Sequence, residues 1–156
     1  MTSCISSMTA DVLKIALGTD HAGFGYKEEI KSFLHRNNYQ TKDFGTFSEE
    51  SVDYPRFVKP AAQAVAGGLC DLGIVLGGSG NGEAIVANKV RGIRCALCWS
   101  THTARLAKEH NDANVIALGQ RQISLELALE IVEVWLSAKF EGGRHFNRIN
   151  MFEPNI

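Results

Sequence analysis

The chain lacks both a strong charge imbalance and a long hydrophobic run. Its 16 Lys and Arg residues nearly balance 17 Asp and Glu residues, which gives a formal net charge of −1, and the basic residues are scattered along the sequence. A nucleic-acid-binding protein normally gathers basic residues on one face, so we expect no nucleic-acid partner. No apolar run approaches the roughly 20 residues of a membrane span, and the first residues lack the basic start and apolar region of a signal peptide. We therefore expect a cytoplasmic protein with no membrane partner.

Cysteine is scarce, with four residues at positions 4, 70, 95 and 98. Only Cys95 and Cys98 are close in sequence, and the apolar run around them predicts a strand. Side chains three residues apart on a strand point to opposite faces of the sheet, so these two thiols cannot share a metal ion or form a disulfide. No second Cys or His pair completes a metal-binding pattern, and we expect structural thiols and no metal site.

Short apolar runs alternate with longer amphipathic segments, a pattern typical of repeated βαβ units. It predicts an α/β fold, a three-layer Rossmann-like sandwich in which helices cover both faces of a five-stranded parallel sheet. The predicted strands are Lys14–Leu17, Gln40–Phe44, Leu72–Leu76, Arg94–Trp99 and Val115–Leu118, and the predicted helices are Tyr26–Arg36, Pro55–Ala66, Glu83–Lys89, Thr103–His110 and Leu125–Ala138. We expect the strand order 2-1-3-4-5 by analogy with related folds, and a ligand site outside the carboxyl ends of the strands.

The length of 156 residues fits one globular domain, since no linker-like segment interrupts the pattern. We assign residues 13–156 to this domain, including a C-terminal tail, and residues 1–12, which are rich in Ser and Thr, to a disordered leader. Within the domain, Asp53 and Pro55 predict the start of the second helix, with Asp53 as its cap. Pro60 either kinks this helix or moves its true start later.

The most informative segment is the glycine-rich run Gly77-Gly78-Ser79-Gly80-Asn81-Gly82-Glu83, between the third predicted strand and the helix after it. Its glycines let the backbone approach a ligand, and the helix start presents free N–H groups that stabilise negative charge. The Gly-Lys-Ser/Thr ending of a phosphate loop is absent, and Glu83 stands where a dinucleotide fingerprint has its last glycine. A carboxylate there would repel a pyrophosphate, but it suits removal of a proton from a carbon beside a developing oxyanion. The alternative is an ordinary strand-to-helix turn with an acidic residue favoured by the helix dipole.

Two histidines and an aspartate stand at informative places in the predicted fold. Asp20 and His21 follow the first predicted strand, where a carboxylate and an imidazole suit a polar, hydroxylated substrate. The alternative is a helix cap for Asp20 and a surface position for His21. His110 ends a predicted helix, where the dipole favours the protonated imidazole that a general acid requires. A plain histidine at a helix end is the alternative.

Two arginines near the C-terminus are four residues apart, so one helical face would present both Arg144 and Arg148. Guanidinium groups match phosphate oxygens two at a time, which makes this segment a candidate phosphate clamp. Arg121, after the fifth predicted strand, is a possible third member. The alternative is a solvated C-terminal helix that docks elsewhere.

Together these segments resemble ribose-5-phosphate isomerase type B, in the family that also includes the galactose-6-phosphate isomerase subunits. The resemblance covers roughly Leu13 to Ile149, and its blocks occur in the family's order: Gly18–Gly23, the glycine-rich run, Ala87–Lys89, His110–Val115 and Glu141–His145. It implies a Rossmann-like sandwich and a homodimer or tetramer with active sites shared between subunits. It also implies isomerisation of a sugar phosphate from aldose to ketose without a metal or other cofactor.

The family has two variants at the glycine-rich run. One variant has a cysteine base where this chain has Gly77, and the other has a glutamate after the glycines, as this chain has at Glu83. The resemblance therefore implies that Glu83 carries a proton between the second and first carbons of the open-chain sugar phosphate. It implies that Ser79 and the amides of residues 78–82 hold the cis-enediolate.

The resemblance also implies roles for the other polar residues. His110, aided by Asp20, would open the furanose ring, and Asn111 would bind a sugar hydroxyl. The phosphate ligands would be His21, Arg121, Arg144 and Arg148. A helix N-terminus lowers the pKa of a carboxyl such as Glu83 whereas a dry pocket raises it, so we expect a closed pocket that a second subunit completes.

Two other functions remain open from the sequence. The same site would accommodate one more carbon, as in galactose 6-phosphate or allose 6-phosphate. Ribose 5-phosphate is favoured because this single chain carries the base, the acid and the phosphate clamp together. A non-enzymatic nucleotide- or flavin-binding module of the same architecture is the second alternative. It is disfavoured because Glu83 faces the anion-binding loop and no Ser/Thr phosphate loop follows the first strand.

Overall fold

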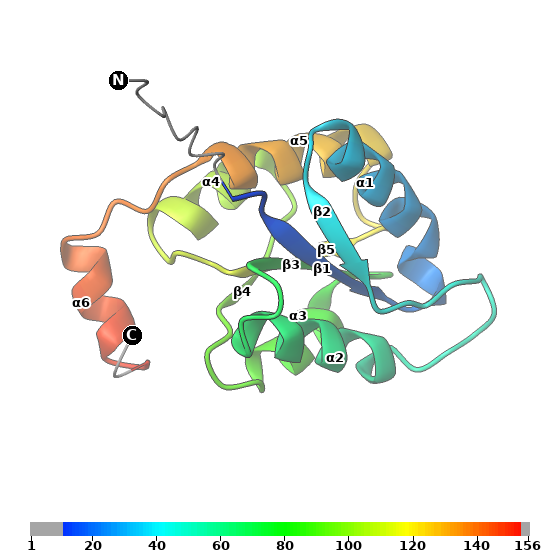
Figure 1. The fold of residues 1–156 in the computed structure, drawn as a ribbon, viewed down its shortest axis with the longest axis horizontal. Coiled ribbons are helices and arrows are strands. Elements are labelled where there is room, and N and C mark those ends of the chain that lie inside the picture. Colours follow the sequence, from blue (N-terminus) through cyan, green and yellow to red (C-terminus); the bar gives the residue numbers. More distant parts are fainter. Residues whose placement is uncertain (1–10, 154–156) are drawn as a thin grey trace, which may run out of the picture.

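The computed structural model describes residues 11–153, so the predicted leader lies outside the described residues except for Asp11 and Val12. One parallel sheet holds β1 (Lys14–Thr19), β2 (Gln40–Asp43), β3 (Leu72–Gly77), β4 (Cys95–Leu97) and β5 (Val115–Gly119). The helices are the 3-10 turn η1 (His21–Gly23), α1 (Phe24–Arg36), α2 (Pro55–Ala66), α3 (Asn81–Asn88), α4 (Thr101–Glu109), α5 (Leu125–Ser137) and α6 (Arg144–Asn150). Helices α1, α4 and α5 cover one face of the sheet and α2 and α3 the other, which confirms the three-layer α/β sandwich (Figure 1).

The strand order is β2-β1-β3-β5-β4, so the predicted order 2-1-3-4-5 was wrong for the last two strands. β5 pairs with β3 and every β5 residue is buried, whereas β4 is a half-buried edge strand of three residues. The segment around β4 is as apolar as β5, and for this reason composition did not distinguish the edge strand from the inner one. The connection from β3 through α3 skips one position in the sheet, and α4 leads the chain back to fill it.

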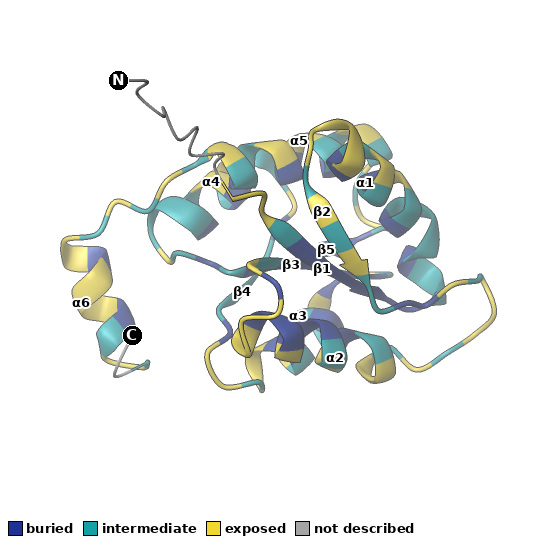
Figure 2. Cartoon of the chain, viewed as in Figure 1, coloured by how far each residue is buried: buried dark blue, intermediate teal, exposed yellow. Residues whose placement is uncertain are grey.

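The two faces of the sheet carry side chains of different size. The larger side chains of β1, β3 and β5 face α1, α4 and α5; they are Ile15, Leu17, Ile74, Leu76, Ile116 and Leu118. Smaller residues at the alternate positions, such as Ala16, Val75 and Ala117, face α2 and α3. All of these residues are fully buried, as the dark blue strands of Figure 2 show. Burial on both faces explains why the central strands are continuously apolar in sequence.

Helix α2 begins at Pro55 as predicted, but Asp53 does not cap it. The residue before the helix is Tyr54, in a helical conformation, and no side chain accepts a capping hydrogen bond there. Pro60 lies inside α2, so it does not move the helix start to a later residue. Because proline has no N–H group, Pro60 leaves one bond of the helix unmade.

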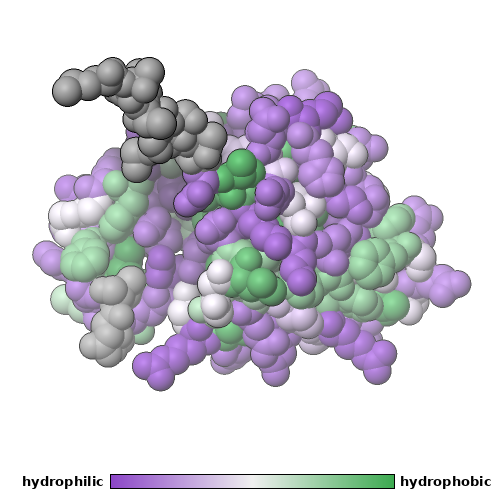
Figure 3. All heavy atoms as spheres, in the orientation of Figure 1, coloured by the Kyte–Doolittle hydropathy of each residue, from purple (hydrophilic) through white to green (hydrophobic). Residues whose placement is uncertain are grey.

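The surface drawn in Figure 3 is largely hydrophilic, with apolar residues in separate patches. Exposed large apolar side chains include Phe47, Ile85, Trp99 and Met151. Among residues 11–153, no helix combines the length and apolar character that crossing a membrane requires.

Candidate active site

Strands β1 and β3 are neighbours, so the residues that follow them lie together at the carboxyl edge of the sheet. The Thr19 hydroxyl, at the end of β1, donates a hydrogen bond to the Leu76 carbonyl of β3 at 3.0 Å. Asp20 comes next and is only 8% exposed. Its carboxylate accepts a hydrogen bond from the Ala22 amide at 2.9 Å, so Asp20 caps the 3-10 turn η1.

Glu83 is buried at the start of α3, with only 4% of its surface exposed. Burial raises the pKa of the Glu83 carboxyl, and the negative charge of Asp20 adds to that rise. The amides of Glu83 and Gly80 act in the opposite direction, because they favour the carboxylate. Glu83 is thus buried within a single chain, whereas the second subunit expected to complete a closed pocket stays a prediction. A carboxyl whose pKa moves toward neutral pH is better suited to act as a general base.

The Glu83 side chain lies directly over Gly77, the last residue of β3. A Cβ atom at position 77 would overlap the Glu83 carboxylate. Position 77 must therefore lack a side chain for Glu83 to point to the carboxyl edge of the sheet. Conversely, the carboxylate fills the place where a side chain at position 77 would project.

The glycine-rich loop is fixed to the neighbouring strand by its own backbone. The carbonyls of Gly77 and Gly78 accept hydrogen bonds from the amides of Gln120 and Arg121, at 2.9 and 3.1 Å, just after β5. Gly80 takes a left-handed conformation, with φ of 84°, and this turn starts α3. Amides in the first turn of a helix have no acceptor within the helix, so the loop directs donors outward. Such a rigid set of donors stabilises an oxyanion.

Polar side chains line this loop. Ser79 is exposed, and its hydroxyl accepts a hydrogen bond from the Asn81 amide at 3.2 Å. The Arg121 side chain lies beside the loop, because a Cβ on Gly78 would be 3.2 Å from its Nη1 atom. His21 is half-buried, and its Nδ1 atom accepts a hydrogen bond from the Val52 amide at 3.2 Å. Asp20, His21, the glycine-rich loop, Glu83 and Arg121 therefore share one edge of the sheet, as predicted.

The other predicted site residues lie at the opposite end of the molecule. His110 ends α4 and Asn111 follows it, so both precede β5 and lie at the amino edge of the sheet. Arg144 and Arg148 are exposed on α6, which lies beyond that same edge, at the far left of Figure 1. One chain thus separates the predicted base and oxyanion loop from the predicted acid and phosphate clamp.

The second group of residues is held together by contacts that the sequence analysis did not find. The rings of His110 and His145 stack, with centroids 4.2 Å apart and planes at 12°. The Glu141 carboxylate lies 3.4 Å from Nε2 of His145 and 4.0 Å from Nε2 of His110. The i, i+4 spacing of Glu141 and His145 was the available signal in the sequence. Burial lowers the pKa of His145, and the charges of His110 and Arg144 lower it further.

Glu141, His110 and His145 are also residue types that bind zinc, and their ligand atoms lie within 4.8 Å of one another. Metal coordination uses the lone pair in the plane of each imidazole ring. Two stacked rings hold these lone pairs in two nearly parallel planes, so one ion cannot lie in both ring planes unless a ring rotates. In the stacked arrangement, each of the two histidine rings holds the other in a defined orientation.

Arg94 connects this group to the body of the protein, a role that the sequence analysis did not predict. Its guanidinium donates to the carbonyls of Asn111, at 2.9 Å, and Asp112, at 2.8 Å. It also forms an ion pair with Glu153, just after α6. The loop that carries His110 and the helix that carries the two arginines therefore share one anchor.

Cys95 and Cys98 point to opposite faces of the sheet, as predicted, whereas Cys4 lies outside the described residues. Cys98 packs with the core under α1, α4 and α5, whereas Cys95 packs on the opposite face, with α2 and α3. Burial raises the pKa of Cys98 to about 12, and it raises the pKa of Cys95 as well. Both thiols are free and remain protonated at neutral pH.

Comparison with known proteins gives the family. The sequence model of the family described as Ribose/Galactose Isomerase matches residues 15–152 of the chain. The chain belongs to this family. Ribose-5-phosphate isomerase B of Escherichia coli (strain K12) is 48% identical over 136 residues, which are 87% of this chain and 91% of that protein. The resemblance seen in the sequence is thereby confirmed.

Solved structures agree with the sequence comparison. The structure of Clostridium thermocellum ribose-5-phosphate isomerase B matches with a TM-score of 0.89 and 51% identity, over 90% of this chain and 95% of that one. Ribose-5-phosphate isomerase B of Mycoplasma genitalium, solved with bound ribulose-5-phosphate, matches with a TM-score of 0.86 and 37% identity, over 89% of this chain and 93% of that one. The fold is thus the fold of this family.

Proposed function

We propose that this protein interconverts ribose 5-phosphate and ribulose 5-phosphate, with Glu83 as the base. Its relatives in Escherichia coli and Clostridium thermocellum bear the name of this activity. The observation that carries the assignment of the base is the position of Glu83, which is buried over Gly77 beside the glycine-rich loop. In the other variant of the family a cysteine base stands at position 77, so the carboxylate occupies the place that this cysteine would take.

In the proposed reaction, Glu83 removes the proton from the second carbon of the open-chain sugar and returns it to the first. The cis-enediolate between these steps lies against Ser79 and the amides of residues 78–82. The raised pKa of Glu83 supports this role, because the group must first accept and then release a proton. Loss of one donor from such a loop costs about 100- to 1000-fold in rate.

We further propose that two copies of the chain complete each active site. A general acid acts only within hydrogen-bond reach of its substrate, about 2.6–3.2 Å, and His110 lies at the edge of the sheet opposite to Glu83. In a dimer or a tetramer, His110 and Asn111 of one copy would face Glu83 of another. Arg144 and Arg148 would accompany them, because α6 is tied to the same loop. His110 then opens the ring, and the arginines bind the phosphate together with His21 and Arg121.

The test is the interconversion of ribose 5-phosphate and ribulose 5-phosphate by the purified chain, without added metal, beside the variant Glu83→Gln. Glutamine keeps the size of the side chain but cannot accept the proton. We expect turnover by the wild type and its loss in the variant. Turnover of galactose 6-phosphate or allose 6-phosphate, but not of the pentose phosphate, would assign a six-carbon substrate to the enzyme instead. Binding of FMN or ATP without any turnover would overturn the proposal.

A further inference from the structure

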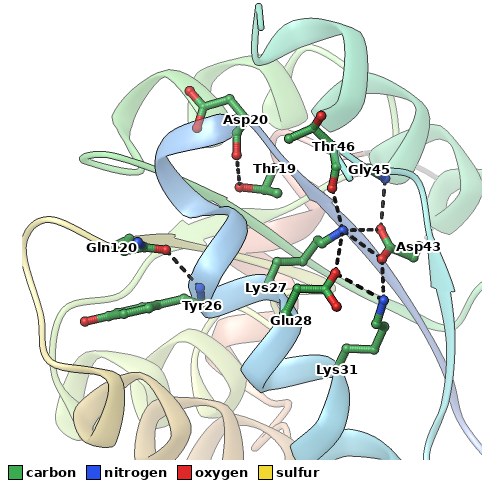
Figure 4. A network of polar contacts seen from close by, with 10 residues as sticks. All are labelled: Thr19, Asp20, Tyr26, Lys27, Glu28, Lys31, Asp43, Gly45, Thr46 and Gln120. Atoms are coloured by element: carbon green, nitrogen blue, oxygen red, sulfur yellow. Dashed lines mark hydrogen bonds and ion pairs between the residues drawn. The ribbon is translucent and has the colours of Figure 1, made fainter. Parts of the chain in front are cut away.

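Lys27 is a fully buried charged side chain that the proposed reaction does not use. Its ammonium contacts both carboxylate oxygens of Asp43, at 2.7 and 2.8 Å, and the carbonyl of Thr46, at 2.6 Å (Figure 4). The rings of Phe24 and Phe47 flank the ammonium, with centroids 5.4 and 4.8 Å away. A charge removed from water is destabilising unless its partners surround it closely, so these contacts hold their partners in one arrangement.

The partners of Lys27 belong to the β2–α2 loop, residues 44–54, and to the strand end that precedes it. The Thr46 amide donates to the Thr19 carbonyl, and the Thr19 amide donates to the Gly45 carbonyl, each at 2.8 Å. The Asp43 carboxylate also accepts a hydrogen bond from the Gly45 amide at 2.9 Å. The loop therefore continues the pairing of β2 with β1 up to the residue before Asp20. Lys27 thus fixes the loop against the start of the candidate active site.

The far end of the same loop reaches His21. The Val52 amide donates a hydrogen bond to Nδ1 of His21 at 3.2 Å. A backbone amide is only a donor, so Nδ1 must be the acceptor and carries no proton. The ring proton of His21 is then on Nε2, and an imidazolium would direct an Nδ1–H group at the Val52 N–H group. The loop therefore selects one neutral tautomer of His21.

We propose that the β2–α2 loop, anchored by Lys27, positions His21 as the neutral Nε2–H tautomer, which donates a hydrogen bond to an oxygen of the substrate phosphate. The identity of the acceptor rests on the proposed function, whereas the tautomer rests on the loop alone. His21 then contributes direction to phosphate binding, and the arginines contribute the charge. Lys27 and Val52 are positioning residues, since neither has to touch the substrate.

The tautomer is measurable in the free protein by NMR. A long-range ¹H–¹⁵N correlation spectrum of the full chain, labelled with ¹⁵N-histidine, separates protonated from unprotonated ring nitrogens. The chain has five histidines, and the variant His21→Asn assigns the signals of His21 by their loss. At neutral pH we expect an unprotonated Nδ1 and a protonated Nε2. A protonated Nδ1, with or without a proton on Nε2, would overturn the proposal.

The role of the loop is tested by two variants that disturb it at different points. Lys27→Met keeps most of the apolar stem and removes the ammonium, and Val52→Pro removes the N–H donor while it leaves the buried ion pair in place. In both variants we expect mixed tautomers of His21 and a ring that no longer points at the phosphate. Loss of the whole hydrogen bond to a charged acceptor would raise KM for ribose 5-phosphate by about 10- to 100-fold, with kcat changed much less. If Lys27→Met does not fold, Val52→Pro alone tests whether the loop positions His21.

Lys31→Met is the matched control. Lys31 also contacts Asp43, at 2.9 Å, but it is partly exposed and does not contact the loop carbonyl that Lys27 holds. We expect this variant to keep both the His21 tautomer and KM. If Val52→Pro also kept both, the loop would have no positioning role. A correct tautomer in a wild-type protein without isomerase activity would instead contradict the proposed function and leave the positioning of His21 intact.

Discussion

The absence of a side chain at position 77 leaves space for the Glu83 carboxylate, and Gly77→Ala tests this relation. The added Cβ atom would overlap the carboxylate. Gly77 is not among the glycines with positive φ, so alanine fits its backbone, and the atoms nearest to its Cβ are those of the Glu83 carboxylate. Since carbon and oxygen atoms that are not bonded settle at about 3.5 Å, the carboxylate must move by roughly 1 Å or more.

A displacement of this size has measurable consequences. Misplacement of a reacting group by about 1 Å costs on the order of 100-fold in rate, so we expect kcat/KM to fall by about 100-fold. The free energy of unfolding should fall by about 1–3 kcal/mol, the usual cost of an extra group in a filled space. The two assays are isomerase turnover and urea unfolding followed by circular dichroism.

Two further variants separate the effects on activity and stability. In Gly77→Ala/Glu83→Ala the overlap is gone, so stability should recover while activity stays lost. Gly73→Ala, on the same strand, places its Cβ 3.1 Å from the Val65 side chain and 3.2 Å from that of Val115. Those side-chain ends are able to shift, so we expect a smaller loss of stability and normal turnover. Normal turnover and stability in Gly77→Ala would refute the position assigned to Glu83.

Two other predictions concern pH and assembly. Because the pKa of Glu83 is raised in the folded state, its contribution to stability is present below the unfolded-state pKa and is lost as pH rises through the folded-state pKa. Glu83→Gln should therefore unfold at a higher urea concentration than the wild type at pH 7, and this difference should shrink in acid. A urea midpoint at pH 7 that is equal to or lower than that of the wild type would contradict the burial of a charged Glu83. The second prediction concerns assembly: Glu83→Gln and His110→Ala should each be inactive alone, and subunit exchange between them should restore about a quarter of wild-type activity. About half of random dimers are mixed, and each mixed dimer has one intact site out of two. No recovery after confirmed exchange would place both residues of a site in one chain.

Much of the fold was predictable because its signals are local. The central strands are buried on both faces, and this made Leu72–Gly77 and Val115–Gly119 recognisable as continuous apolar runs. The order of β4 and β5 was not predictable, since an edge strand that is half-buried has the same composition as an inner one. The order depends on which strand pairs with β3, and no single segment encodes that choice.

The candidate site was predictable in its parts more than in its assembly. The glycine-rich run and Glu83 were recognisable as a candidate oxyanion loop and base, because their spacing is set by local chemistry. His110 precedes β5 and therefore lies at the amino edge, away from Glu83, a separation that the sequence analysis did not predict. Lys27 was missed because a lysine on an amphipathic helix normally extends into solvent. Its burial depends on Asp43, which only the tertiary fold brings to it.

The central claim is that Glu83 is the base of a sugar-phosphate isomerase, and the most direct measurement compares kcat for ribose 5-phosphate in the wild type and in Glu83→Gln. A general base contributes about 100- to 10,000-fold, so we predict a loss within this range, with KM changed far less. Circular dichroism and the predicted rise in urea midpoint would show that the variant is folded. A folded variant that retains the wild-type kcat would contradict the account.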